Sequence, residues 1–451
     1  KLFFSRRQGP AMAGLGGGGA GMRRLRAFCG QLAPASCGGE EPRRPLAGIR
    51  VVELATVLAA PSCGALLADY GAEVIKIENP QVPDITRSWG YGDDPARTAD
   101  PGLHATVECG GSAFVQLNRG KKSVGLDPTT PEGKDVLLKL LATADVFFTN
   151  VRLKALKKTG LDYEALAPHF PKLIYGHLSA FGRDGPMVDD PGYDFGAFWA
   201  QSGLMDIAKA DDDAAPPREP GGIGDYNTGM QLLGGIFAAL YDRTQTGCGQ
   251  LVDASLMRAG VWSMGQPLVS YMGGNSWGTG IEWKTGAPST AGPVRGTAVI
   301  GERMMFTTKC PFKLKCGTWI QLLGNDVGKS MEKTRAALGV PAETLWGPDM
   351  RKIDWQAANR VADAIFAQRT LEEWAPILKQ HDVWYTPIHR FEDQCDPSSP
   401  AFVQSKAVGV FSEGDHVPGV SRHDLLLSPV KLSRAPALPR APALEMPCPR
   451  P

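Results

Sequence analysis

The sequence lacks the features of several large protein classes. Its 451 residues carry a formal net charge of only +1, so no overall basic field favours nucleic acid or an acidic membrane. No apolar run approaches the roughly 20 residues that a membrane-spanning helix needs. The nine cysteines form no CxxC pair and no Cys/His cluster, and HExxH is missing. We therefore expect no metal site, no nucleic-acid partner and no membrane insertion.

The motifs of common nucleotide enzymes and hydrolases are also missing. The turn after the first expected strand reads Ala55-Thr-Val-Leu-Ala-Ala-Pro61 and has no GxGxxG, which disfavours NAD or FAD chemistry. Neither GxxxxGK[ST] nor GxSxG occurs, so a P-loop and a serine-hydrolase elbow are disfavoured too. The reacting group must therefore be sought among other side chains.

Short apolar segments alternate with helical ones in the first half of the chain. Expected strands cover residues 49–54, 73–77, 123–126, 145–149 and 173–178. Expected helices lie between them, at 62–70, 131–142 and 163–167. Strands and helices that alternate at this spacing predict a parallel sheet with helices on both faces. The fold class is therefore α/β, with a Rossmann-like large domain and a smaller α/β domain further along.

Composition divides the chain into parts. Residues 1–45 are basic, poor in acids and rich in glycine and alanine, which is typical of an organellar leader or of a disordered tail. We expect a mitochondrial location from this leader, and otherwise a cytoplasmic one. Residues 46–265 are expected to form the N-terminal part of the large domain. A glycine-rich linker with active-site loops is expected over 266–300, and the small domain over 301–390.

A long helix that begins near an aspartate is expected from residue 224 to residue 240. Its apolar face recurs at three- and four-residue steps, with Met230, Leu233, Phe237 and Leu240. Asp225 lies at the helix start, where backbone N–H groups and the helix dipole stabilise a carboxylate, so we expect it to be ionised at neutral pH. An ionised carboxylate can attack a thioester carbonyl. The alternative is that Asp225 only caps the helix.

Further motifs accompany this helix in a set order. They are Leu46-Ala-Gly-Ile-Arg-Val-Val-Glu-Leu, Gly71-Ala-Glu-Val-Ile-Lys-Ile-Glu78, Asn118-Arg-Gly-Lys-Lys-Ser123, Gly182-Arg-Asp-Gly-Pro186, Gly224-Asp-Tyr-Asn-Thr-Gly-Met and Pro429-Val-Lys-Leu-Ser433. Together they resemble the class III CoA-transferases, a family that includes formyl-CoA transferase, carnitine CoA-transferase, succinate–hydroxymethylglutarate CoA-transferase and α-methylacyl-CoA racemase. The resemblance covers residues 45–442.

The resemblance implies an activity and a set of site residues. Such transferases move CoA from an acyl-CoA thioester to a free carboxylic acid, here expected to be dicarboxylic, through an intermediate on the aspartate that matches Asp225. CoA thioesters are the substrates, and no permanently bound cofactor is implied. The CoA-binding positions carried over are Val57, Leu58, Leu126, Asp127, Asn150, Val151, Arg152 and Lys158, with Gly192 and Tyr193 at the acyl end.

The resemblance also implies an interlocked homodimer, with residues 391–445 returning to the large domain. Two alternatives stay open. One is an acyl-CoA racemase or isomerase that uses Asp225 as a general base. Tyr193 stands where the racemase has histidine, and because tyrosine is a poor base this favours the transferase. The other is a CoA-binding protein without turnover, since Asn79 replaces a phosphate-contacting arginine of formyl-CoA transferase.

Overall fold

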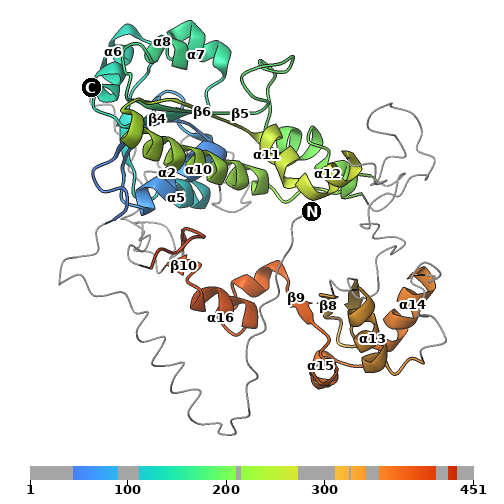
Figure 1. Ribbon diagram of the computed structural model, residues 1–451. Helices are drawn as coiled ribbons and strands as arrows, with labels where there is room; N and C mark the ends of the chain where they lie inside the picture. The colour runs from blue at the N-terminus through green and yellow to red at the C-terminus, as the bar shows by residue number, and fades with distance from the viewer. Residues whose placement is uncertain are drawn as a thin grey trace, which may run out of the picture.

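The computed structural model describes seven parts of the chain, namely residues 44–89, 111–209, 215–272, 310–324, 327–341, 355–412 and 425–433. The expected leader, 1–45, and the expected glycine-rich linker, 266–300, lie mostly outside these residues. Figure 1 shows a larger α/β body, coloured blue to yellow, and a smaller body in orange. No helix within the described ranges is long and apolar enough to span a bilayer.

The larger body is built on a six-stranded parallel sheet in the order β3-β2-β1-β4-β5-β6. The strands are β1 (Arg50–Leu54), β2 (Glu73–Glu78), β3 (Lys122–Gly125), β4 (Val146–Thr149), β5 (Ile174–Ser179) and β6 (Leu251–Ser255). This is the strand order of a Rossmann fold, so the α/β expectation is confirmed. Each strand expected from an apolar run lies within one residue of its expected ends, while β6 was not expected.

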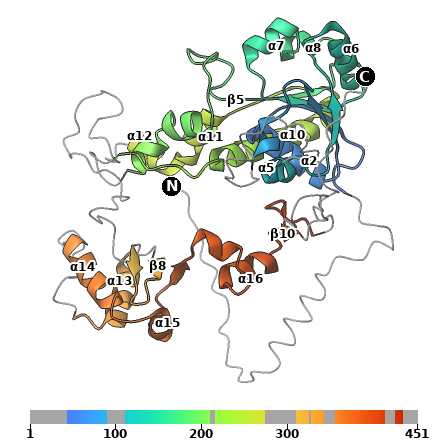
Figure 2. The ribbon, with the colours of Figure 1, turned by 180° about the vertical axis from the view of Figure 1, so that it is seen from behind.

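Helices cover both faces of this sheet. Neighbouring strand residues point to opposite faces, so Phe148 packs under one helical layer and Phe147 under the other. The first layer contains α2 (Ala59–Asp69), α5 (Ser112–Asn118), α10 (Ile223–Thr246) and α11 (Leu256–Ser263), and the second contains α6 (Pro131–Leu141), α7 (Leu153–Thr159) and α8 (Tyr163–Leu166). Figures 1 and 2 show these layers on either side of the strands.

The 24-residue helix α10 packs against both α2 and the strands β5 and β6 of the sheet. Its expected apolar face is wrong in part, because Phe237 is 36% exposed, whereas Leu232 and Ile236 are fully buried against Gly176 of β5. Two surfaces cover α10, so its buried face is wider than one stripe. At the crossing with α2, a Cβ on Gly229 would lie 2.1 Å from the side-chain oxygen of Ser62.

The smaller body has its own core beneath a three-stranded antiparallel sheet, β7 (Pro311–Lys313), β8 (Trp319–Leu322) and β9 (Tyr385–Ile388). Helices α13 (Val327–Leu338), α14 (Trp355–Phe366) and α15 (Leu371–Gln380) pack on it. Phe366 lies between Phe312 and Trp374, with ring centroids 4.7 and 5.0 Å away, and Trp374 Nε1 donates to its carbonyl oxygen at 3.0 Å.

The end of the described chain contacts the larger body again. After α16 (Pro400–Ala407), the short strands β10 (Phe411–Ser412) and β11 (Leu425–Leu426) pair antiparallel. Leu426 exchanges two 3.0 Å hydrogen bonds with the side-chain amide of Gln116 in α5. The hydroxyl groups of Ser428 and Tyr70 lie 2.9 Å apart.

The α2–α10 crossing can be tested with two alanine substitutions on one helix. We expect Gly229→Ala to lower the free energy of unfolding by about 1–3 kcal/mol, because its Cβ overlaps Ser62 and the Ala59 carbonyl. Gly234→Ala is the control: nothing lies within 4 Å of its Cβ, so alanine should stabilise the helix by about 0.5–1 kcal/mol. Urea denaturation measures both, and equal effects would refute the close crossing.

Candidate active site

A cavity of about 640 Å³ opens at the carboxyl edge of the sheet, beside the point where the strand order reverses between β1 and β4. Its walls come from the segments after β1, β4 and β5 and from the start of α10. The structure brings eight of the expected site residues together there: Val57, Asn150, Val151, Arg152, Lys158, Gly192, Tyr193 and Asp225. The roles assigned to them from the sequence stay predictions.

Three expected CoA contacts do not line this cavity. Leu58 is the residue before α2, and its side chain lies toward Gly222. Leu126 and Asp127 follow β3, two strands away from β1 on the same edge. Asp127 accepts hydrogen bonds from the hydroxyl (2.7 Å) and the N–H (2.9 Å) of Thr129, which lower its pKa. A ligand would have to extend beyond the cavity to reach this pair.

Three cations of one short segment line the cavity without a carboxylate partner. Arg152, Lys154 and Lys158 are exposed, and within the described residues none of them forms an ion pair. By contrast, Arg183 is paired with both carboxylate oxygens of Glu164, at 2.7 and 2.8 Å. Unpaired cations around a cavity suit an anionic ligand such as a phosphate. Lys154 was not expected, although it lies four residues before Lys158 and so on the same helix face.

Asp225 lies in the first turn of α10 but is not its cap. The cap is Gly222, and α10 begins at Ile223, so the alternative of a capping aspartate is wrong. Asp194 lies at this end of the helix, where its Oδ2 accepts the N–H of the cap residue Gly222 at 2.8 Å. Asp194 is the first residue of the π-helix η2 (Asp194–Ala200) and is nearly buried. Sequence reasoning missed it, although it directly follows Tyr193.

The carboxyl of Asp225 is held in a setting that disfavours its charge. It is 8% exposed, and no hydrogen bond to it occurs in the described part of the chain. Burial, and then the negative charge of Asp194, raise the pKa of Asp225 to about 7. The expectation of a fully ionised group at neutral pH was therefore wrong, since burial outweighs the helix dipole. A carboxyl that titrates near neutrality suits a base or nucleophile.

An aromatic pair and a histidine border the cavity. Tyr193 is 60% exposed and stacks on Phe195 with ring centroids 5.9 Å apart. His177 is fully buried and its Nε2 donates to the Val151 carbonyl at 3.0 Å. Burial lowers the pKa of His177. No cluster of three or more His, Cys, Asp or Glu suited to a metal ion occurs among the described residues.

The backbone of Val57 is strained. Its φ of +69° lies in the left-handed region, where a β-branched side chain is an outlier. Such a conformation costs about 1–3 kcal/mol and persists only when its surroundings impose it. No pattern in the sequence indicates this strain, because valine normally favours extended structure.

Comparison with known proteins gives a consistent result. The model of CoA-transferase family III matches residues 46–446. The (R)-2-hydroxy-4-methylpentanoate CoA-transferase of Clostridioides difficile is 31% identical over 357 residues, which cover 78% of this chain and 81% of that protein. The α-methylacyl-CoA racemase of Mus musculus is 28% identical, covering 88% of each chain. A crystal structure of a CAIB/BAIF family protein from Brucella suis, 28% identical, superposes with a TM-score of 0.67, covering 89% of this chain and 96% of that one.

The raised pKa of Asp225 predicts a pH-dependent gain in stability when its charge is removed. Between about pH 4 and 7 the folded protein binds more protons at Asp225 than the unfolded chain, so stability falls as pH rises. Asp225→Asn should therefore raise the free energy of unfolding at pH 8 by on the order of 1–3 kcal/mol, and by less than half as much at pH 5, because only part of the stability loss has occurred by then. Asp127→Asn, whose pKa shift has the opposite sign, should give no gain. A gain of equal size at both pH values would contradict the burial argument.

Proposed function

The chain belongs to CoA-transferase family III, and from this premise we propose that it transfers CoA from an acyl-CoA thioester to a free carboxylic acid through a covalent intermediate on Asp225. The observation that supports this most directly is one cavity that holds both the buried Asp225 carboxyl and three cations that form no ion pair with any described residue. CoA has phosphates at one end and its reactive thioester at the other, so it needs both features.

In the proposed reaction, the ionised Asp225 attacks the carbonyl carbon of the acyl-CoA. The C–S bond breaks, CoA leaves as a thiolate, and a mixed anhydride forms. The thiolate then attacks the aspartyl carbonyl, which releases the donor acid and leaves an aspartyl-CoA thioester. The acceptor carboxylate attacks this thioester in turn and again displaces the thiolate. Attack of the thiolate on the acceptor's carbonyl forms the new acyl-CoA and frees Asp225.

The burial of Asp225 favours the proposed reaction in two ways. A carboxylate that has lost most of its water needs less desolvation before it attacks, and its pKa of about 7 leaves a large ionised fraction at neutral pH. An anhydride and a thioester are also both hydrolysed by water, so a site where Asp225 is only 8% exposed protects them.

The proposed CoA orientation follows from the walls of the cavity. Arg152, Lys154 and Lys158 would bind phosphates, the chain of the cofactor would pass Val57 and Val151, and the acyl group would lie beside Gly192 and Tyr193. Leu58, Leu126 and Asp127 would contact only parts of the ligand that extend outside the cavity. The cations favour this direction because they are all on α7 or just before it, away from Asp225 on α10.

Three finer expectations belong to the same proposal. The acceptor is a dicarboxylic acid, the protein is an interlocked homodimer whose large domain takes in both ends of the chain, and the basic leader directs it to mitochondria. The second and third are accessible to simple measurements: sedimentation of the full chain, and the location of a fluorescent fusion carrying residues 1–45.

A racemase or isomerase is the second candidate function. A pKa near 7 suits Asp225 as a general base. The similarity to the mouse racemase also extends over 88% of that protein's length. Racemisation also needs a second group that can accept or donate a proton on the opposite face of the α-carbon, and Tyr193, a poor base, stands at the sequence position where the racemase has histidine. The transferase is therefore favoured.

Intact-protein mass spectrometry with a panel of acyl-CoAs tests the transferase directly. We expect a hydroxylamine-sensitive mass increase on the wild type, none on Asp225→Asn, and passage of CoA to an added acid. If no adduct forms with any donor while solvent deuterium enters the α-carbon of the acyl group, the isomerase replaces the transferase. If neither occurs but CoA binds, the protein is a binding protein without turnover.

The pH dependence of turnover tests the role of the Asp225 charge. Because only the ionised carboxyl can attack, kcat/KM should rise up to tenfold per pH unit below about pH 7 and level off by pH 8. The measurement is the rate of CoA transfer from pH 5.5 to 8.5 with one donor and one acceptor. A flat profile across that range would show that no group with a pKa near 7 takes part.

A further inference from the structure

The backbone N–H of Val57, the residue in the left-handed conformation, forms a hydrogen bond with the buried carboxylate of Asp84. The Val57 N–H donates to Asp84 Oδ1 at 3.1 Å. The same oxygen accepts the N–H (3.1 Å) and the hydroxyl (2.8 Å) of Thr86. Asp84 is 1% exposed, and its two bonds with Thr86 are buried while the bond with Val57 is partly buried, so all three are shielded from water to some extent and are electrostatically stronger than in solvent. Asp84 is thus a fixed acceptor for a strained residue in the wall of the cavity.

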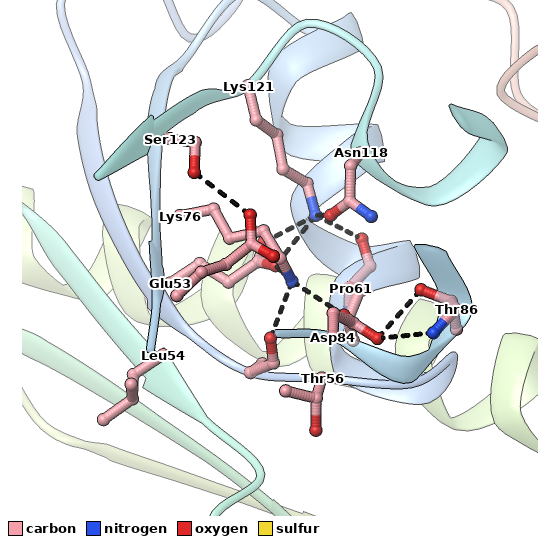
Figure 3. Close-up of polar contacts among 12 residues, drawn as sticks. Glu53, Leu54, Thr56, Pro61, Lys76, Asp84, Thr86, Asn118, Lys121 and Ser123 are labelled. Carbon is pink, nitrogen blue, oxygen red and sulfur yellow. Dashed lines mark hydrogen bonds and ion pairs between the residues drawn. The ribbon is translucent and has the colours of Figure 1, made fainter. Parts of the chain in front are cut away.

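Lys76 fixes Asp84 and the start of the same turn together. Its Nζ lies 3.0 Å from Asp84 Oδ2, 2.7 Å from the Ala55 carbonyl oxygen and 3.2 Å from Glu53 Oε1 (Figure 3). Lys76 and Glu53 are fully buried. Although burial opposes the Asp84 charge, Lys76 and the Thr86 hydrogen bonds hold the pKa of Asp84 below its ordinary value. One buried cation therefore ties the acceptor to the residue two positions before Val57.

Side chains from two other parts of the chain form hydrogen bonds with the backbone on either side of Val57. Thr56 donates its N–H to Asn150 Oδ1 at 3.1 Å, and its carbonyl accepts from Asn150 Nδ2 at 2.7 Å, which bridges β1 to β4. Lys121 donates to the Pro61 carbonyl in α2 at 3.0 Å (Figure 3). Backbone groups from residue 55 to residue 61 are therefore fixed by side chains rather than by the sheet alone.

We propose that Asp84 is a positioning residue, which selects the left-handed conformation of Val57 and so sets where the β1–α2 turn meets the ligand. The proposal rests on the proposed function, because the ligand is taken to be a CoA thioester. Val57 and Ala59 line the cavity together with Asp225. If Val57 relaxed to an ordinary conformation, the chain entering α2 would take another direction and the wall opposite Asp225 would move.

Replacing Val57 by glycine tests this proposal, because glycine adopts a φ of +69° without strain and should not need Asp84 to hold it there. Asp84→Asn leaves one acceptor oxygen where aspartate has two, so it can serve Lys76 or Val57 but not both. We expect D84N to weaken CoA binding at least tenfold in the wild-type background and less than threefold in the V57G background. Isothermal titration with CoA, and KM and kcat for transfer, are measured on all four proteins. The loss should fall on the Kd and KM rather than on kcat.

Two further variants separate positioning from general damage. Asp69→Asn breaks the equally buried ion pair with Arg119, which does not touch the turn, so it should lower the melting temperature and leave CoA affinity unchanged. Thr86→Val keeps the shape of the core but removes the 2.8 Å hydroxyl bond to Asp84. It should give a smaller loss of affinity than D84N, again reversed by V57G, and it serves if D84N fails to fold.

The outcomes distinguish this proposal from the proposed function. Equal losses on D84N, or on T86V, in both backgrounds would overturn the positioning role, as would wild-type affinity in D84N. A wild type that binds CoA but transfers it to no acid removes the transferase alone, and the affinity cycle still decides the role of Asp84. A wild type that binds no CoA overturns both.

Discussion

The reversal of strand order between β1 and β4 is the constraint on which the rest of the site depends. Chain segments leaving these two strands turn to opposite faces of the sheet, so a crevice remains at their carboxyl ends. Thr56 follows β1, Asn150 follows β4, and the two hydrogen bonds between them cross that crevice. The cavity forms beside this link, and its walls contain both the cations on and just before α7 and Asp225 of α10. Topology thus creates the space, and side chains define its walls.

Burial disfavours the charge of two aspartates of this site, and the neighbouring groups decide whether the pKa of each ends above or below its ordinary value. Asp84 is buried beside Lys76, and its pKa stays below the ordinary value, so it is a permanent anion that can hold backbone in place. Asp225 is buried beside Asp194, and its pKa rises to about 7, so both its neutral and its ionised form are populated at neutral pH. A structural role needs the first setting and a reacting group needs the second.

The sequence predicts most of the parallel sheet well because its central strands are short apolar runs between polar turns, as in residues 145–149, which match β4 to within one residue. The resemblance to a known family also singled out Arg152 and Lys158, and both line the cavity. The sequence could not predict the pKa of Asp225, which depends first on burial by the folded chain and then on the charge of Asp194 in a different element. Nor could it predict the strain at Val57, since its acceptor lies 27 positions away and is identified only by the folded backbone.

The return of the chain to the larger body has a consequence for biosynthesis. Ser428 meets Tyr70 across 358 positions, and Leu426 meets Gln116 across 310. A ribosome must therefore release nearly the whole chain before α2 and α5 acquire these contacts, and the smaller body emerges and can fold in the meantime. Pairings of such long range slow folding and leave apolar surface exposed to wrong partners while translation continues. The nascent chain should accordingly depend on chaperones until its last segment is made.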